Sequence, residues 1–489
     1  MAKRTAVIDI GSSSIRLVIY EKSSRFAFHL LHEAKSRVRL SHDSYQNDGN
    51  LQKEPIERTL LALTEFQSII KSYKVQKTLC VATSAVRDAP NKKEFIKKIL
   101  EKTGISIKVI DGEKEAKLGG IACANLLSKT SGLTIDIGGG STECSIIDGG
   151  TVLKSMSLNI GTIRLKELFC DDKNIEEATQ YIDHAIEELP QEALQNVKNI
   201  IGIGGTFRAV SQALLEQSEH SLNILHGFEY SSKKLKHFLK NILEATEKEL
   251  KELGIKKERF DIIKPGALII LRILKYTEIN HIISSGVGVR EGVYLHDLLR
   301  NTKDQFPHNY DTSVQNLIDR FMMHPAHASQ RQEVSMKIIS LLQNDFNVSS
   351  INLRALKVAA KLSSIGKSIN FYSYHHHSQL LIDNGLTYGF SHKEIILIST
   401  LVRFHKRKRT SKEHLDIHHD ILPIRDELRT MSFSIALSEI LLQHFPRNID
   451  FKISYKNKML TISGKNLYLA QEKAKNLEIP HDIELVFNS

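Results

Sequence analysis

The chain has 489 residues, a formal net charge of +11 and a pI near 9.2. This length predicts two to four domains, and the hydrophobic fraction of 41% is ordinary for a globular protein. No apolar run is long enough to cross a bilayer and no signal-type segment follows Met1, so we exclude a membrane protein and expect a cytoplasmic one.

The first predicted elements form a meander of short strands. Residues 7–19, VIDIGSSSIRLVI, consist of an apolar strand, a loop of glycine and serines, and a second strand, and a third strand follows a Lys-Ser-Ser turn. Apolar residues recur at helical spacing across 55–70, and residues 79–82 predict a short buried strand. That strand opens into ATSAVRDAPN, a polar loop that contains Ser84 and Arg87.

A helix, a strand and a second helix are expected next. Asn91 is placed to cap the first of these helices and Gly104 to end it. A short strand at 107–110 leads into DGEKEAKLGG, in which Glu113 and Glu115 lie at the start of the second helix. The helix dipole favours carboxylates at that end, so either glutamate also has an ordinary structural explanation.

A second copy of the N-terminal pattern lies at residues 133–147, LTIDIGGGSTECSII. Both copies consist of a β-branched strand, Ile-Asp-Ile-Gly, a loop of small residues and another strand. Asp9 and Asp136 occupy matching positions in the two copies. The same register matches two further pairs, Gly11 with Gly138 and Ser14 with Ser141. An internal repeat of this kind predicts two related half-folds that face each other.

The two loops have the composition of phosphate-binding loops. Glycine and serine let the backbone approach a phosphate and point N–H groups at it, and the aspartate before each loop can hold a hydrated Mg²⁺. Each loop leads into a strand, whereas the P-loop and the dinucleotide fingerprint both open a helix. A glycine-rich hairpin with solvated carboxylates is the alternative, and the repeated aspartate favours the functional interpretation.

The rest of the chain divides into three parts. Two strand–glycine–helix units, with GIGGTFRA and SSGVGVREG at their turns, fit a second half-fold and place helix N-termini where an anion could dock. The composition turns polar around 301–311, and residues 314–445 then have a nearly all-helical pattern. A Gly-Lys-Ser triplet at 366–368 looks like the end of a P-loop, but Lys361 stands where the first glycine belongs. Residues 450–486 predict a small β-β-α-β unit.

In this order the motifs resemble the exopolyphosphatase / guanosine pentaphosphate phosphohydrolase family, within the superfold of actin, sugar kinases and heat-shock chaperones. The resemblance rests on IDIGSSSIRLVI, ATSAVRDAPN, GEKEA, IDIGGGSTE, GIGGTFRA and SSGVGVREG. A sugar kinase or chaperone would share the two Asp-Gly loops but not GEKEA or ATSAVRDAPN. The implied fold is α/β, a duplicated actin-like (ribonuclease H-like) core followed by an all-helical HD-like domain and a small α+β unit. The implied domains are 1–124, 125–305, 306–446 and 447–489.

The resemblance also implies catalytic residues. Glu115 is implied as the base that orients water on the terminal phosphorus. Glu113 is its rival, and Glu115 is preferred because it directly precedes the alanine of the family pattern. Arg87 is implied as the guanidinium that grips the terminal phosphate.

A metal and a set of phosphate contacts are implied as well. Asp136 and Glu143 are implied near Mg²⁺ or another divalent cation, with Asp9 facing them from the other half. Ser13 departs from the family, whose loop usually has asparagine there, and this changes one amide contact to the phosphate. The implied phosphate-binding residues are Gly11, Ser12, Ser13, Ser14, Ser84, Gly138, Gly139, Gly140, Ser141, Thr142, Gly204, Gly205 and Thr206.

The histidine-rich helical region resembles the family's C-terminal domain, which is related to HD phosphohydrolases. The likeness is clearest at HHHSQLLIDN, GFSHKE and LVRFHKR. A working HD site would read His-Asp before Ile-Gly-Lys, where this chain has Ser363 and Ser364. Serine hydroxyls are poor replacements for imidazole and carboxylate on a divalent metal, so we expect an inert, metal-free domain. The histidines expected in packing, surface or anion-contact roles are His375, His376, His377 and His405.

The leading hypothesis is Mg²⁺-dependent release of terminal phosphate from polyphosphate, or conversion of guanosine pentaphosphate to tetraphosphate, by a homodimer. The basic charge fits a polyanion, and the run at 403–409, RFHKRKR, is either part of a groove for it or a solvated helix end. The competing class is a regulator that binds polyphosphate or alarmones without turnover. A sugar kinase is a further alternative, but the sequence shows no residues that would form the nucleotide pocket and the sugar contacts of such an enzyme. Specific nucleic-acid binding is not expected, because the chain has no tryptophan and few aromatic residues for stacking.

Overall fold

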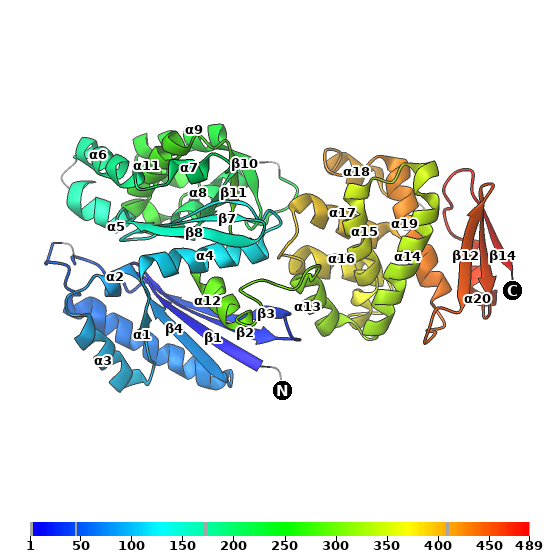
Figure 1. Ribbon diagram of the computed structural model, residues 1–489, viewed down its shortest axis with the longest axis horizontal. Coiled ribbons are helices and arrows are strands. Elements are labelled where there is room, and N and C mark those ends of the chain that lie inside the picture. Colours follow the sequence, from blue (N-terminus) through cyan, green and yellow to red (C-terminus); the bar gives the residue numbers. More distant parts are fainter. Residues whose placement is uncertain (1–2, 45, 171–173, 219, 407–409, 489) are drawn as a thin grey trace. The chain divides into compact units, whose positions relative to one another are not determined.

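The structure, a computed structural model, describes residues 3–44, 46–170, 174–218, 220–406 and 410–488. The chain forms two compact units, Met1–Tyr310 and Asp311–Ser489. Figure 1 labels their elements. Among the described residues, no helix combines the length and the hydropathy needed to cross a membrane.

A five-stranded sheet forms the N-terminal half of the first unit. Its strands are β1 (Lys3–Ile10), β2 (Ile15–Lys22), β3 (Phe28–Ser36), β4 (Lys77–Ala82) and β5 (Lys108–Val109). In the order β3-β2-β1-β4-β5, the first three strands are antiparallel neighbours and the last two run parallel to β1. Helices α1 (Lys53–Ser72) and α3 (Lys92–Thr103) contribute the buried rings of Phe66 and Phe95 to the core of this half.

A six-stranded sheet repeats this arrangement in the second half. Its strands are β6 (Gly132–Ile137), β7 (Thr142–Asp148), β8 (Thr151–Leu158), β9 (Asn199–Ile203), β10 (Glu229–Ser231) and β11 (His281–Ser284). The order is β10-β11-β9-β6-β7-β8, so β6 takes the place of β1, with antiparallel β7 and β8 on one side and parallel β9 and β11 on the other. In both halves the small-residue loop joins the central strand to an antiparallel neighbour. This confirms the predicted duplicated α/β core.

The second half carries most of the helices of the first unit. Its core includes Phe207 from α8 and Leu239 from α9, both buried. The elements are α5 (Thr162–Leu165), the π-helix η1 (Lys166–Cys170), α6 (Ile175–Ile186), α7 (Gln191–Leu194), α8 (Gly204–Glu216), α9 (Ser232–Glu244), α10 (Glu247–Glu252), the 3₁₀ turn η2 (Lys257–Arg259) and α11 (Phe260–Thr277).

Two helices join the halves. Helix α4 (Gly112–Leu126) follows the strands of the first half but packs against β7 and β8 of the second (Figure 1). Helix α12 (Val289–Leu298) ends the second half and contacts both α4 and β1. A Cβ on Gly292 would lie 1.9 Å from the Leu118 carbonyl oxygen, so only glycine permits this close crossing. The exchanged helices therefore hold the two repeats in one unit.

The second unit is a helical bundle that ends in a small sheet, as predicted. Its helices are α13 (Thr312–Phe321), α14 (Pro325–Phe346), η3 (Ser350–Asn352), α15 (Leu353–Leu362), η4 (Ile365–Ser368), α16 (Tyr374–Gly385), α17 (His392–Phe404), α18 (Lys412–Ile417) and α19 (Arg425–Leu441). Strands β12 (Phe451–Lys456) and β13 (Met459–Gly464) are antiparallel, and β14 (Glu484–Asn488) follows α20 (Tyr468–Ala474) to lie parallel to β13. Leu342, Leu437 and Leu460 place α14, α19 and the sheet in one core.

Three local details differ from, or go beyond, the sequence expectations. The stretch predicted as a polar loop contains a short helix, α2 (Ser84–Arg87), whose two apolar residues are buried. Asn91 precedes α3, but its amide bonds the backbone N–H and carbonyl of Leu51 at 3.0 and 2.9 Å and does not cap the helix. Gly104 ends α3 with φ +69°, as predicted. In the basic run 403–409, residues 407–409 lie outside the described residues.

Candidate active site

A cavity of about 370 Å³ lies between the two halves of the first unit. Both predicted phosphate loops line it, 11–14 from the β1–β2 turn and 138–141 from the β6–β7 turn. The loops approach each other closely, because a Cβ on Gly139 would lie 2.8 Å from the Cβ of Ser12. The Ser12 hydroxyl is 3.1 Å from the hydroxyl of Ser84, which also lines the cavity. The repeat therefore brings its two small-residue loops to one site.

Four of the carboxylates that line this cavity were predicted from the sequence, and the strand register explains how two of them are placed. Asp136 pairs with Glu143 across β6 and β7, so the two side chains share one face of the sheet. Asp9 occupies the same place at the end of β1, opposite Arg16 on β2. Glu115 reaches the cavity from the first turn of α4. The structure thus collects all four predicted acidic residues.

The environment of these carboxylates raises their pKa values. Burial, and next the charge of Glu143, raises the pKa of Glu115 well above its usual value. Burial raises the pKa of Glu143 to about 7 and that of Asp136 to about 6. The pKa of Asp9 is raised for the same reason, although Arg290 and Arg16 oppose the shift. Carboxylates that lie close together in a cavity are stabilised when a cation binds between them. Raised carboxylate pKa values of this kind are typical of functional sites.

Helix α4 separates the two rival glutamates. Asp111 caps the helix by accepting the backbone N–H of Lys114 at 2.7 Å, which fixes the first turn. Glu113 is exposed, whereas Glu115 is 8% exposed and lines the cavity. One guanidinium nitrogen of Arg87 donates to Glu115 Oε2 at 3.1 Å, and another lies 3.5 Å from the Ser141 hydroxyl. Arg87 does not itself line the cavity, but both of its partners do.

Three arginines that the sequence interpretation overlooked face the carboxylates. Arg16, Arg208 and Arg290 all line the cavity. Burial, together with the charges of Arg290 and Arg16, lowers the pKa of Arg208 to about 10. Arg290 is 7% exposed and donates to Glu33 at 3.0 Å, and Arg16 donates to the same carboxylate at 3.2 Å. Each follows one of the glycine turns within a few residues, in GSSSIR, GGTFR and GVR, which is the signal that could have identified them.

Further cations extend the positive lining beyond the carboxylates. The cavity is also lined by Lys35, Arg37, Arg39 and Arg259. Burial and the charges of Arg16, Arg37 and Arg259 lower the pKa of Lys35 to about 8. Such mutual repulsion is relieved when an anion with several charges binds.

Gly204 lines the cavity at a point where a larger side chain would not fit. It begins α8 with φ +76°, and a Cβ there would lie 1.9 Å from Asp136 Oδ1. Gly205 and Thr206 line the cavity beside it. Arg208, one turn later, donates to the Gly204 carbonyl at 2.9 Å. The predicted glycine turn is therefore a close approach of backbone to a carboxylate.

Two predicted phosphate contacts are placed away from the cavity lining. Gly140 does not line the cavity, and its carbonyl accepts a hydrogen bond from Arg164 at 2.8 Å. The Thr142 hydroxyl donates to the carbonyl of Ile160 at 2.6 Å, and the side chain is fully buried. Both residues therefore contribute to the backbone structure around the second loop and not to the cavity lining.

The carboxylates fit a divalent cation that binds together with a phosphate. In the part of the chain that the structure describes, no three His, Cys, Asp or Glu side chains form a group that could hold a metal alone. Mg²⁺ is usually held by one or two carboxylates, while waters and substrate phosphates complete its octahedron. Asp9 and Asp136, with Glu143 beside them, are hard oxygen donors at a phosphate-type loop, so the donor set suits Mg²⁺.

Comparisons with known families cover nearly the whole chain. Residues 4–301 match the Ppx/GppA phosphatase family, and residues 310–471 match Ppx/GppA phosphatase, domain III. A guanosine-5'-triphosphate,3'-diphosphate pyrophosphatase of Pseudoalteromonas translucida is 28% identical over 412 residues, 82% of this chain and 80% of that protein. A bifunctional 3-dehydroquinate synthase/phosphatase of Fusobacterium nucleatum is 33% identical over 57% of this chain, but the match spans only 44% of its own length.

Solved structures agree with the fold of the first unit. An exopolyphosphatase from Cytophaga hutchinsonii is 27% identical, with a TM-score of 0.54, and covers 60% of this chain and 98% of its own. A Ppx/GppA family member from Aquifex aeolicus is 26% identical, with a TM-score of 0.52, and covers 62% of this chain and 99% of its own.

Proposed function

The chain belongs to the Ppx/GppA phosphatase family, and we propose that it hydrolyses the terminal phosphoanhydride bond of a linear polyphosphate or of guanosine pentaphosphate. The observation that carries this proposal is the lining of one cavity. The four predicted carboxylates, which come from both halves, lie with the arginines Arg16, Arg208 and Arg290 beside two glycine-serine loops. Phosphoryl transfer needs this combination, because it depends on positioning and on charge stabilisation more than on covalent chemistry.

Glu115 is the base in this proposal. Its carboxylate takes a proton from a water molecule, whose oxygen forms a bond to the terminal phosphorus. The bond from that phosphorus to the bridging oxygen breaks, and its electron pair leaves on the shortened chain. The raised pKa of Glu115, which follows from burial and from Glu143, makes it a stronger base than an ordinary carboxylate. Arg87 holds Glu115 until a terminal phosphate competes for its guanidinium.

Mg²⁺ fits the proposal as the cofactor. Asp9 and Asp136, with Glu143 beside them, would hold it. When bound it would neutralise charge on the phosphoryl oxygens. The serine and glycine loops would supply N–H and O–H donors to the same oxygens, and Arg208 and Arg290, which line the same cavity, would supply positive charge.

The outer cations support a substrate with several phosphates in a row. Lys35 and Arg259 add positive charge along the cavity, and Arg37 and Arg39 are paired there with Glu258 and Asp261. Relatives carry both names: the Pseudoalteromonas protein is called a guanosine-5'-triphosphate,3'-diphosphate pyrophosphatase and the Cytophaga protein an exopolyphosphatase. The proposal therefore includes both substrates, and the assay ranks them.

The test is phosphate release by the full chain with Mg²⁺ from long-chain polyphosphate and from guanosine pentaphosphate in parallel. Glu115→Gln should lower kcat by about 10²–10⁴-fold, the usual contribution of a general base. Glu113→Gln is the matched control, because the same change on the exposed neighbour should leave the rate unaltered. If the wild type binds both substrates without releasing phosphate, the enzyme proposal is wrong. The chain would then be a regulator that only binds polyphosphate or alarmones.

We also propose a cytoplasmic homodimer. The location is supported by the thiols of Cys80, Cys123 and Cys144, which are buried and free. The dimer is supported by the family resemblance alone. Light scattering on the purified chain tests it, since a mass near 55.3 kDa would indicate a monomer.

A further inference from the structure

A second cavity, of about 740 Å³, lies within the helical unit. Ser364 and Lys367 line it, so it lies beside the place where an HD phosphohydrolase would carry its metal ligands. The Ser363 hydroxyl donates to the carbonyl of Ala360, and the Ser364 hydroxyl contacts the sulfur of Met322. Neither serine is thus arranged as a metal ligand. A metal site of the HD type therefore does not account for this cavity.

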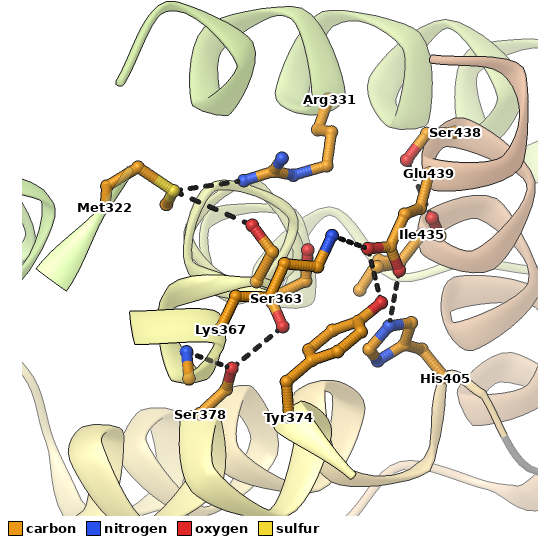
Figure 2. Close-up of polar contacts among 12 residues, drawn as sticks. Met322, Arg331, Ser363, Lys367, Tyr374, Ser378, His405, Ile435, Ser438 and Glu439 are labelled. Atoms are coloured by element: carbon orange, nitrogen blue, oxygen red, sulfur yellow. Dashed lines mark hydrogen bonds and ion pairs between the residues drawn. The ribbon is translucent and has the colours of Figure 1, made fainter. Parts of the chain in front are cut away.

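A buried carboxylate organises the polar wall of this cavity. Figure 2 shows Glu439 on α19 contacted by three side chains from other elements. Lys367 donates to its Oε1 at 3.2 Å, the Tyr374 hydroxyl donates to the same oxygen, and His405 lies 3.0 Å from Oε2. Burial alone would raise the pKa of Glu439, but the hydrogen bond and charge of His405, with Lys367 and Arg331, lower it well below its usual value. Glu439 is therefore an anion that fixes cations around the cavity.

The cations of the wall outnumber this one carboxylate. Arg331 is 5% exposed, and its guanidinium donates to the carbonyls of Ala360 and Lys361. Lys406 and Lys473 also line the cavity. In the described part of this wall, the ion pairs join Glu439 to Lys367 and His405, and neither Lys406 nor Lys473 forms one; the Lys406 ammonium lies 3.8 Å from the centre of the Tyr374 ring. The wall thus has a net positive charge that an anion would balance.

Exposed apolar side chains line the same cavity. Phe371 is 68% exposed and Phe445 is 51% exposed, and both line it together with Met323, which is 67% exposed. The ring of Phe445 also contacts His327, with centroids 4.7 Å apart. Large apolar side chains left in water at a cavity point to a ligand with an apolar or planar part.

We propose that this cavity binds a nucleotide, with its phosphates on Lys406 and Lys473 and its base against Phe371. Pockets of about 300–1,000 Å³ suit small ligands of this size, and bases stack on aromatic rings. An inorganic phosphate chain would use the cations but gain nothing from the exposed rings. A bare divalent cation would be repelled by Lys367 and Arg331. The site is separate from the proposed hydrolytic cavity and does not depend on that activity.

Photo-crosslinking of the full chain with 8-azido-ATP, followed by peptide mapping, tests the proposal. Label is expected in the segments that carry Phe371, Phe445 and Lys473. The double variant Lys406→Glu with Lys473→Glu should reduce this label by about tenfold or more, because each lysine would donate a charge-assisted hydrogen bond to the phosphates. Phe371→Ala should reduce it by roughly fivefold or more through lost stacking.

Matched controls separate the cavity from general surface effects. Lys337→Glu with Lys393→Glu makes the same charge change at exposed positions outside the cavity, and Tyr468→Ala removes an aromatic ring that is 72% exposed elsewhere in the unit. Both should leave the label unchanged. Label confined to the first unit, or cavity label unaffected by the cavity variants, would overturn the proposal. Equal displacement of the label by inorganic tripolyphosphate and by unlabelled ATP would show a site for any polyphosphate and would also overturn the nucleotide assignment.

Discussion

The substitution Gly204→Ala tests whether the position of the Asp136 side chain matters to the reaction, and a control variant accounts for its effect on stability. The added methyl group would lie 1.9 Å from Asp136 Oδ1, a distance that no real contact tolerates. The side chain of Asp136 must therefore move away from the phosphate-type loops. The backbone at Gly204 also has φ +76°, a conformation that alanine adopts with strain.

The two effects have different sizes. Left-handed backbone at a residue with a Cβ costs about 1–2 kcal/mol of unfolding free energy. Displacement of a catalytic group by about 1 Å lowers the rate roughly 10²-fold. Gly104→Ala isolates the first effect, because Gly104 has φ +69° and no atom within 4 Å of the added methyl group.

The assay combines urea unfolding with phosphate release from polyphosphate. Gly204→Ala should lose at least as much stability as Gly104→Ala, and only Gly204→Ala should lose about two orders of magnitude in kcat/KM. If Gly204→Ala keeps an activity close to that of Gly104→Ala, the position of Asp136 does not matter to the reaction and the proposed site is wrong.

Three further changes probe other parts of the structure. Arg208→Met should lower kcat/KM by about 10²–10³-fold, as loss of one charge-stabilising donor does, while Arg300→Met, on an exposed arginine outside the cavity, should have no effect in the same assay. Gly292→Ala should reduce the unfolding free energy in urea by about 1–3 kcal/mol or more, because its methyl group would lie 1.9 Å from the Leu118 carbonyl; wild-type stability would disprove the close helix crossing. The pKa of Glu439 is depressed in the folded state, so this carboxylate stabilises the fold above its unfolded pKa and loses that contribution as the pH falls below about 4.3. Glu439→Gln should therefore flatten the dependence of the unfolding free energy on pH between about pH 5 and pH 3. An unchanged slope would contradict the contacts of Glu439 with Lys367, Tyr374 and His405.

The repeat in the sequence was sufficient to predict that the two loops and their aspartates lie in one cavity. The spacing from Asp9 to Ser14 recurs from Asp136 to Ser141, and equal spacing in equal folds places equal side chains at equivalent ends of two sheets. The choice of Glu115 over Glu113 agrees with the helix geometry, since only Glu115 turns inward.

Other features depend on contacts between distant segments, which periodicity does not reveal. Asn91 has the sequence features of a helix cap, but Leu51, 40 residues earlier, offers its amide better partners. Arg290 and Glu33 meet across 257 residues, and His405 and Glu439 across 34. These pairs are set by the packing of whole helices and sheets, so the sequence shows each member but not its partner.

The central claim is that water attacks the terminal phosphorus in the cavity between the two halves, and ¹⁸O-labelled water tests it most directly. The full chain would hydrolyse polyphosphate and guanosine pentaphosphate in labelled water with Mg²⁺, and mass spectrometry would locate the label. The account predicts one solvent oxygen in the released orthophosphate and none in the shortened product. Label in the shortened product would place the attack on another phosphorus, and would contradict the arrangement of Glu115 and the two loops around a terminal phosphate.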